Sequence, residues 1–168
     1  MRLPAAALLA LAAGCTPLGT IKAYPGPDRS SDELGAVETV MRSETFSITD
    51  NEITSVDGVR FEKRGYVAQM LPGARWIGLQ GTLRFGRQPR VQHCVFELNV
   101  DPGCLYRPAV PAYPRDALDQ PAAAEWRVTR AMTVVAECTE KMSYAVQVPI
   151  DCSARPLCYS GSTVGPCP

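Results

Sequence analysis

Hydrophobic and polar residues alternate with a period of two along most of the chain after residue 44. In the run 75–85 (RWIGLQGTLRF), Ile77, Leu79, Leu83 and Phe85 fall on one face, which is typical of a strand with one buried side. Comparable runs are TFSIT, EITSV, GYVAQML, VQHCVFELNV, EWRVTRAMTVVAEC and SYAVQVPI. The pattern predicts about seven or eight short strands in one β-rich domain.

Turn residues separate these runs. Asp57-Gly58 is the dipeptide of a tight hairpin, and Pro72-Gly73 closes the strand candidate that ends at Leu71. The chain holds 15 prolines and 13 glycines, which disfavour long helices. The fold class expected is mainly β, an antiparallel β-sandwich or barrel-like domain.

Two segments depart from the strand pattern. Ser30 and Glu33 have the spacing of a capping box, and Leu34, Val37 and Met41 form an apolar stripe, so the pattern predicts one short N-terminal helix over 30–42. Residues 105–124 carry four prolines and predict a long surface loop between two strands.

The first residues form a targeting segment. Arg2 precedes an apolar run over residues 5–13 that ends in small residues, which predicts a secretory signal peptide over residues 1–14. The sequence AAGC resembles the lipobox of bacterial lipoproteins and marks Cys15 as the residue that carries acyl chains such as palmitate. The alternative is an ordinary secreted protein in which Cys15 is an incidental thiol.

An acylated Cys15 makes the membrane a partner through a lipid anchor, since several acyl chains hold a protein stably. Thr16 follows the cysteine where many inner-membrane lipoproteins have aspartate, so the outer membrane, at its periplasmic face, is the expected location. The organisation expected is a Pro/Gly-rich tether over 15–29 and a single domain over 30–168. A cysteine-rich tail over 151–168 completes that domain.

Cysteine usage supports export. The chain has seven cysteines, and setting Cys15 aside leaves an even set in the second half of the chain. In an oxidising compartment such a set predicts a disulfide framework, and fifteen connectivities are open for six cysteines. The disulfide candidates are Cys94, Cys104, Cys138, Cys152, Cys158 and Cys167.

Charge and reactive residues point away from several function classes. The 17 basic and 17 acidic residues balance, which implies no nucleic-acid partner. The one histidine, His93, neighbours Cys94 on a strand and should face away from it, so neither a Ser/His pair nor a zinc site is favoured. We therefore expect no catalytic residues, no metal and no cofactor, and we interpret Asp57 as a turn residue.

Aromatic residues are the remaining candidates for recognition. Tyr106, Tyr113 and Trp126 lie in or beside the proline-rich loop, where they predict a partner surface for an envelope protein. The alternative, favoured for the tryptophans Trp76 and Trp126, is that they cover the core or the sheet.

A series of spaced motifs carries a family resemblance. The series comprises Tyr24-Pro25-Gly26-Pro27, Val56-Asp57-Gly58, Leu71-Pro72-Gly73, Cys94, Asp101-Pro102-Gly103, Tyr106 and Trp126. Over about residues 15–130 it resembles small uncharacterised lipoproteins of Gram-negative bacteria. The resemblance implies a β-rich, exported, lipid-anchored domain. Members of that group often carry a histidine shortly after the leucine-proline-glycine turn, where this chain has Arg75.

The function expected from the sequence is that of a lipid-anchored cell-envelope protein that binds or supports rather than catalyses. The alternative is a periplasm-facing enzyme, or an inhibitor, acting on peptidoglycan or on an envelope enzyme.

Overall fold

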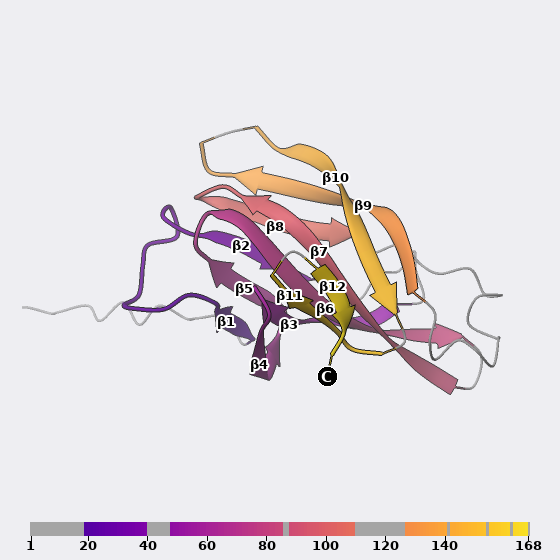
Figure 1. Ribbon diagram of the computed structural model, residues 1–168. Coiled ribbons are helices and arrows are strands. Elements are labelled where there is room, and N and C mark those ends of the chain that lie inside the picture. The colour runs from indigo at the N-terminus through magenta and orange to yellow at the C-terminus, as the bar shows by residue number, and fades with distance from the viewer. Residues whose placement is uncertain are drawn as a thin grey trace, which may run out of the picture.

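The computed structural model describes residues 19–39, 48–85, 88–109, 127–140, 142–153, 155–161 and 163–167 (Figure 1). The described residues contain β-strands and no helix. The strands are β1 (Thr20–Lys22), β2 (Gly35–Glu38), β3 (Ile48–Val56), β4 (Val59–Gly65), β5 (Val67–Met70), β6 (Gly73–Phe85), β7 (Gln88–Val100), β8 (Cys104–Ala109), β9 (Arg127–Cys138), β10 (Tyr144–Ser153), β11 (Leu157–Ser160) and β12 (Thr163–Pro166). The mainly β class expected from the alternation is confirmed.

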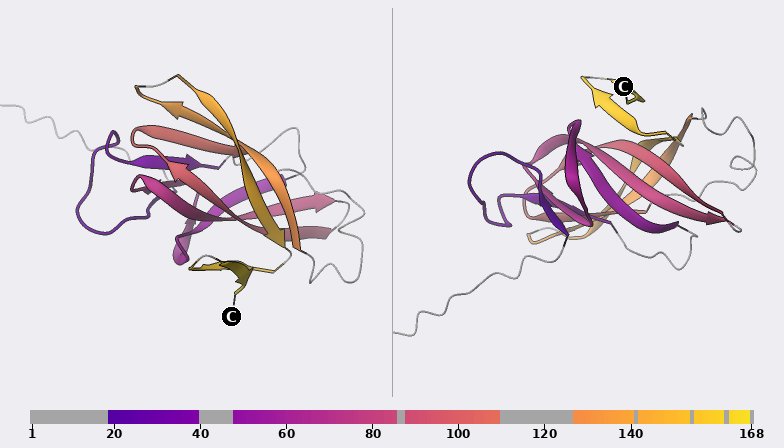
Figure 2. Two further views of the ribbon diagram at one scale, coloured as in Figure 1. Left: turned by 45° about the horizontal axis from the view of Figure 1, so that its top comes forward. Right: turned by 90° about the horizontal axis from the view of Figure 1, so that it is seen from below.

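Ten of these strands form one curled sheet in the order β1-β5-β2-β8-β9-β10-β7-β6-β3-β4. The chain leaves β4 at one end of this order and enters β5, next to the other end, through Tyr66 alone. This continuity bends the sheet into a half-barrel (Figures 1 and 2). The barrel-like form is therefore closer to the structure than a sandwich of two packed sheets.

Most pairs in the sheet are antiparallel, as the short turns require, but two are parallel. β1 pairs parallel to β5 and β2 pairs parallel to β8. The largest element is the hairpin of β6 and β7, which stay in register from Gly73 opposite Val100 to Phe85 opposite Gln88. Alternate residues of both strands, including Ile77, Leu79, Phe96 and Leu98, point into the curl and build the core there.

The expected N-terminal helix is wrong within the described residues. Ser30 and Glu33 do make a capping contact, since the Ser30 backbone N–H donates to Glu33 Oε2 at 3.1 Å, but the chain makes only a turn there. Gly35–Glu38 then form β2 between β5 and β8. A side chain at Gly35 would collide with Val100, so this close packing of strands requires glycine, a poor helix former.

Parts of the segments expected as a tether (15–29) and as a loop (105–124) belong to the sheet. Thr20–Lys22 belong to the sheet as β1, and Leu105–Ala109 belong to it as part of β8. Pro108 is accommodated in β8 because the pairing with β2 involves Leu105 and Tyr106, so at Pro108 the described partner is β9 alone. The remaining residues of the predicted loop, 110–124, lie outside the described part of the chain.

The tail continues the sheet and then leaves it. Asp151–Ser153 complete β10, after which β11 and β12 form a separate two-stranded hairpin. This tail hairpin lies on the outer side of the curled sheet over β6 and β7 (Figure 2). Trp76 of β6 stacks there on Tyr159 of β11, with ring centroids 4.6 Å apart. Trp76 therefore covers the sheet, as its alternative interpretation held.

The six cysteines after residue 90 form three disulfides, as expected from their even number. Cys94 is bonded to Cys152, Cys104 to Cys138, and Cys158 to Cys167. The first two bonds join residues directly opposite each other on neighbouring antiparallel strands. The third closes the tail hairpin on itself, so this hairpin is held to the sheet by packing.

No helix among the described residues has the length and apolarity that crossing a membrane requires.

Candidate functional site

Three turns that are far apart in the sequence meet at one end of the half-barrel. They are the segment after β1 (Ala23–Pro25), the β3–β4 turn at Asp57-Gly58, and the β5–β6 turn at Leu71-Gly73. The β3–β4 turn has positive φ at both central residues, 50° at Asp57 and 78° at Gly58, as a two-residue hairpin of this kind requires. The hairpin predicted from the Asp-Gly dipeptide is confirmed.

Asp57 links two of these turns. One carboxylate oxygen accepts a hydrogen bond from the backbone N–H of Trp76 at 2.9 Å, and the other pairs with Arg75 at 2.9 Å. Arg75 also donates to the carbonyl oxygens of Leu71 and Pro72, at 2.9 and 3.0 Å. Each guanidinium nitrogen of Arg75 thus holds a turn in place, and Asp57 has a structural role beyond the turn assigned to it from sequence.

Lys22 organises the third turn in a similar way. Its ammonium donates to the carbonyl oxygen of Gly26 at 2.6 Å, pairs with Asp28 at 2.8 Å, and lies 5.0 Å from the ring centroid of Tyr24. The hydrogen bond from Lys22 lowers the pKa of the Asp28 carboxyl. The Ala23 N–H donates to Gln69 of β5 at 2.8 Å and fixes this segment to the sheet.

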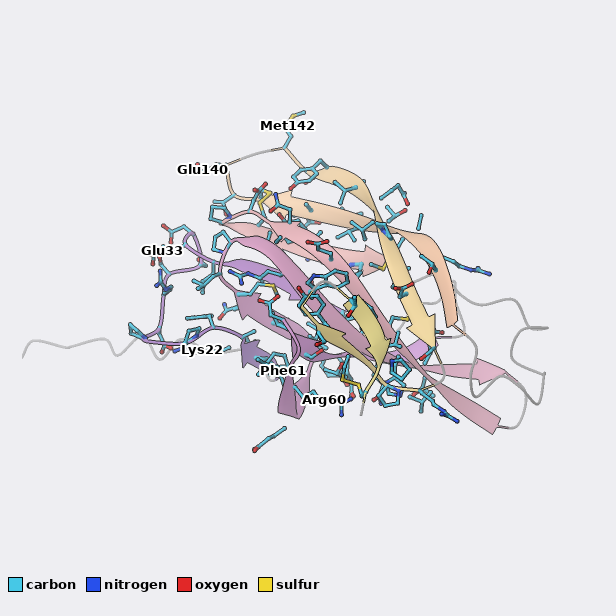
Figure 3. All side chains as sticks on the ribbon, in the orientation of Figure 1. Lys22, Glu33, Arg60, Phe61, Glu140 and Met142 are labelled. Atoms are coloured by element: carbon cyan, nitrogen blue, oxygen red, sulfur yellow. A yellow bond between two sulfur atoms is a disulfide. The ribbon has the colours of Figure 1, made fainter. Side chains whose placement is uncertain are left out.

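A cavity of about 400 Å³ lies between the three turns. Its lining is mainly apolar and includes Tyr24, Pro25, Val56, Val59, Phe61 and Leu71. Figure 3 shows Lys22 and Phe61 on this side of the molecule, at β1 and β4. Val59 is 65% exposed, so its side chain is accessible from solvent at the edge of this cavity. We call these residues, with Lys22, Asp57 and Arg75, the turn pocket.

The charges around the turn pocket determine which ligand it suits. Lys22 is paired with Asp28 and Arg75 with Asp57, so both cations are matched by carboxylates. A charged ligand would have to displace one of these pairs, whereas an apolar group would only replace water against apolar walls. The arrangement is thus suited to binding an apolar side chain or segment.

Replacing Asp57 by alanine is expected to destabilise the pocket and the fold. The variant loses a charged hydrogen bond to the backbone and the pair with Arg75, and it places alanine at positive φ. We expect the free energy of unfolding to fall by about 2 kcal/mol, measured by urea denaturation. Asp57→Asn is the matched control because asparagine tolerates positive φ, and it should lose about half as much. A stability of Asp57→Ala equal to that of the wild type would contradict this role.

Of the three residues predicted from sequence for a partner surface, the described part of the chain contains only Tyr106. Tyr106 is 1% exposed and points into the core, so its assignment to an exposed surface is wrong. It was placed in a loop, but β8 carries it, and alternate residues of β8 face inward. Tyr113 and Trp126, like Cys15, lie outside the described residues.

The Tyr106 hydroxyl has a structural role instead. It accepts a hydrogen bond from the Asp101 N–H at 2.8 Å and lies 3.3 Å from the Tyr144 hydroxyl, which donates to Asp101 Oδ2 at 3.2 Å. Burial raises the pKa of the Tyr106 phenol, and the contact with Tyr144 adds to the shift. These bonds fix the turn at Asp101-Gly103 against β8 and β10.

The reactive side chains considered from sequence stay apart. Cys94 is buried in the core and bonded to Cys152, while His93 lies on the opposite face of β7, as the alternation predicted. Among the described residues, no three His, Cys, Asp or Glu side chains are grouped as a metal ion would require.

Sequence reasoning did not identify the residues that build the turn pocket. The prolines and glycines of the three turns are visible in the sequence, and Arg75 stands where the resembled lipoproteins often have histidine. Their convergence depends on the sheet order, which no local pattern contains. Each turn directly joins or follows a strand, and the strand ends of one curled sheet lie at its rims. This was the one sequence feature that could have indicated that the turns lie close together.

No protein-family model matches this chain, and no similar curated protein or solved structure was found. The resemblance to small Gram-negative lipoproteins therefore stays a prediction.

Proposed function

We propose that this chain is a lipid-anchored cell-envelope protein that acts by binding, not by catalysis, and that the turn pocket receives an apolar segment of an envelope protein partner. Acylation at Cys15 would hold it at the periplasmic face of the outer membrane. The proposal has two parts, the anchor and the pocket, which rest on different observations.

The observation that carries the anchor is the division of the cysteines. Six of the seven cysteines pair within the folded domain, which leaves Cys15 as the one cysteine outside the disulfide framework. Three disulfides in one small domain are typical of proteins that fold in an oxidising compartment. A single remaining cysteine directly after an apolar leader suits a lipid carrier.

The short distance from Cys15 to the sheet supports a partner at the membrane surface. β1 begins at Thr20, five residues after Cys15. Five residues span at most about 17 Å when fully extended. The pocket residues begin with Lys22, the last residue of β1, and continue to Pro25, so an anchored chain would hold the turn pocket near the membrane.

Cross-linking from the pocket tests the binding part. A photoreactive benzoylphenylalanine at Val59 should give one discrete adduct with an envelope protein in intact cells. Val135 of β9 is the matched control, since it is also an exposed valine, at 38%, but lies outside the turn pocket. Equal adducts from both positions, or none from Val59, would contradict the proposed site.

Fractionation of the same cells tests the anchor. Wild type should be recovered with the membranes and carry a mass increase at Cys15, whereas Cys15→Ser should be recovered in the soluble fraction without that mass. Recovery of Cys15→Ser with the membranes in wild-type amounts would reject acylation as the means of attachment. The Val59 adduct should also decrease in Cys15→Ser cells, because the pocket is then no longer held near the membrane.

A further inference from the structure

A second cavity lies between the outer face of the sheet and the tail hairpin. It has a volume of about 350 Å³ and is bounded by β3, β4, β6 and β7 on one side and by Pro156 and Leu157 on the other. Phe61 lines both cavities, but the polar groups of this one are different. They are Thr54, Ser55, Arg60, Gln80 and His93. We call it the tail pocket.

Gly78 makes room for two hydroxyl groups in the tail pocket. A methyl group at Gly78 would collide with Ser55 Oγ and stand 3.1 Å from Thr54 Oγ1. The absence of a side chain on β6 therefore lets both hydroxyls lie against the strand. Hydroxyls and the Gln80 amide can all donate hydrogen bonds, so this wall can serve as a set of donors.

Arg60 supplies the charge of the tail pocket. Its guanidinium donates to Cys158 Sγ at 3.4 Å and also contacts Cys167 Sγ, and sulfur is a weak acceptor. In the described part of the chain no carboxylate pairs with Arg60. None of the described lining residues is acidic. Figure 3 shows Arg60 at the edge of the molecule beside the tail hairpin, where a ligand can reach it from solvent.

Arg107, unlike Arg60, is paired with carboxylates. Its guanidinium pairs with Glu38 at 2.7 Å and with Glu137 at 2.5 Å, and these bonds, that to Glu38 foremost, raise the pKa of Arg107. Arg75 is likewise paired, with Asp57. Arg60 differs from both because, among the described residues, its side chain contacts disulfide sulfurs and no carboxylate, so its charge is available to an external anion.

We propose that the tail pocket is a binding site for the oxyanion group, carboxylate or phosphate, of a small molecule. Arg60 pairs with the anion, since a guanidinium is always charged and matches two oxygens at once. Thr54, Ser55 and Gln80 donate to the remaining oxygens. The volume is at the small end of the range for ligand pockets and suits a compact molecule. This site is independent of the turn pocket and of the anchor.

The Cys158–Cys167 disulfide holds one wall of this site, Pro156 and Leu157, in place. It joins β11 to the residue after β12, and the Cys167 N–H donates to the Pro156 carbonyl oxygen at 3.1 Å. Pro156 and Leu157 are thereby held over the sheet, and both sulfurs are held beside Arg60. Loss of this disulfide should weaken anion binding without changing any donor side chain.

Titration of the full chain, purified with its disulfides intact, tests the proposal. Inorganic phosphate and acetate are added in separate series at constant ionic strength, and the NMR signals of the Arg60 Nε–H and the His93 ring are followed. At least one anion should give saturable shifts. Arg60→Gln should weaken binding at least tenfold, because a charged hydrogen bond is lost. Arg29→Gln, the same charge change at an exposed position away from the pocket, should leave affinity unchanged.

The comparison of anions and variants separates the outcomes. Saturation by phosphate alone or by acetate alone supports the site and identifies which oxyanion it takes. Arg60→Lys should retain part of the affinity, and Cys158→Ala/Cys167→Ala should lose several-fold while retaining the folded spectrum of the sheet. Shifts that are linear, or equally strong in wild type and Arg60→Gln, would overturn the proposal. Failure here would leave the fractionation and cross-linking results of the proposed function unaffected.

Discussion

Replacing Cys94 and Cys152 together by alanine is expected to lower the free energy of unfolding by about 4 kcal/mol. The bond joins residues 58 positions apart, so its loss returns much conformational freedom to the unfolded chain. Both cysteines are also buried, at 3% and 0% exposure, and each alanine leaves space in the core. The Gln92 amide loses the sulfur to which it now donates at 3.0 Å.

The tail disulfide provides the comparison for this prediction. Cys158 and Cys167 are separated by only 9 positions and are partly exposed, so Cys158→Ala/Cys167→Ala should lose about 3 kcal/mol or less. Urea denaturation of both double variants measures the difference. A larger loss of unfolding free energy in the tail variant than in Cys94→Ala/Cys152→Ala would contradict the prediction, because the disulfide between β7 and β10 would then contribute less to stability than its position implies.

Replacing Gly65 by alanine is expected to cost about 2–3 kcal/mol of stability. Gly65 is the last residue of β4, where the chain crosses to β5 and closes the curl. A Cβ there would collide with the Gly19 carbonyl oxygen and lie 2.7 Å from Ile21 Cγ1. The same oxygen accepts the hydrogen bond from the Tyr66 N–H at 3.0 Å, so the strands cannot separate without losing that bond.

Gly165→Ala is the matched control for Gly65→Ala. Gly165 lies on β12 with no atom within 4 Å of the added methyl, so its stability should change by less than about 0.5 kcal/mol. Besides the unfolding free energy, hydrogen exchange at the Tyr66 N–H should become faster in Gly65→Ala. Unchanged stability together with unchanged exchange would contradict the tight approach of β1 to Gly65.

The strands were predictable because each one depends on its own residues. The alternation in β6 and β7 needs no knowledge of a partner, and the turn at Asp57-Gly58 follows from two residues that accept positive φ. The error over residues 30–42 has a related cause. Ser30 and Glu33 form the capping contact locally, but Gly35–Glu38 pair with β5 and β8, whose residues lie far along the chain.

The single turns of the turn pocket were predictable from sequence, but their convergence was not. Each of its turns could be recognised from proline and glycine, and Asp57 was interpreted correctly as a turn residue. Its pairing with Arg75 depends on β3 lying beside β6. The same limit explains Tyr106, because the proline-rich composition around it indicated a loop while the pairing of β8 with β9 placed its ring in the core.

By itself the sequence determined the β class, the positions of the main turns and the even set of cysteines, because periodicity, positive φ and residue counts are local or additive properties. Only the tertiary structure decided the order of ten strands, which one of the fifteen possible disulfide connectivities forms, and the two pockets. Cys94 meets Cys152 because β7 and β10 pair in one register, and Arg60 meets the tail sulfurs because a hairpin from the end of the chain packs over β6. Residues that are distant in the sequence become neighbours in these places because the arrangement of the whole sheet is the stable one, and no local pattern contains that information.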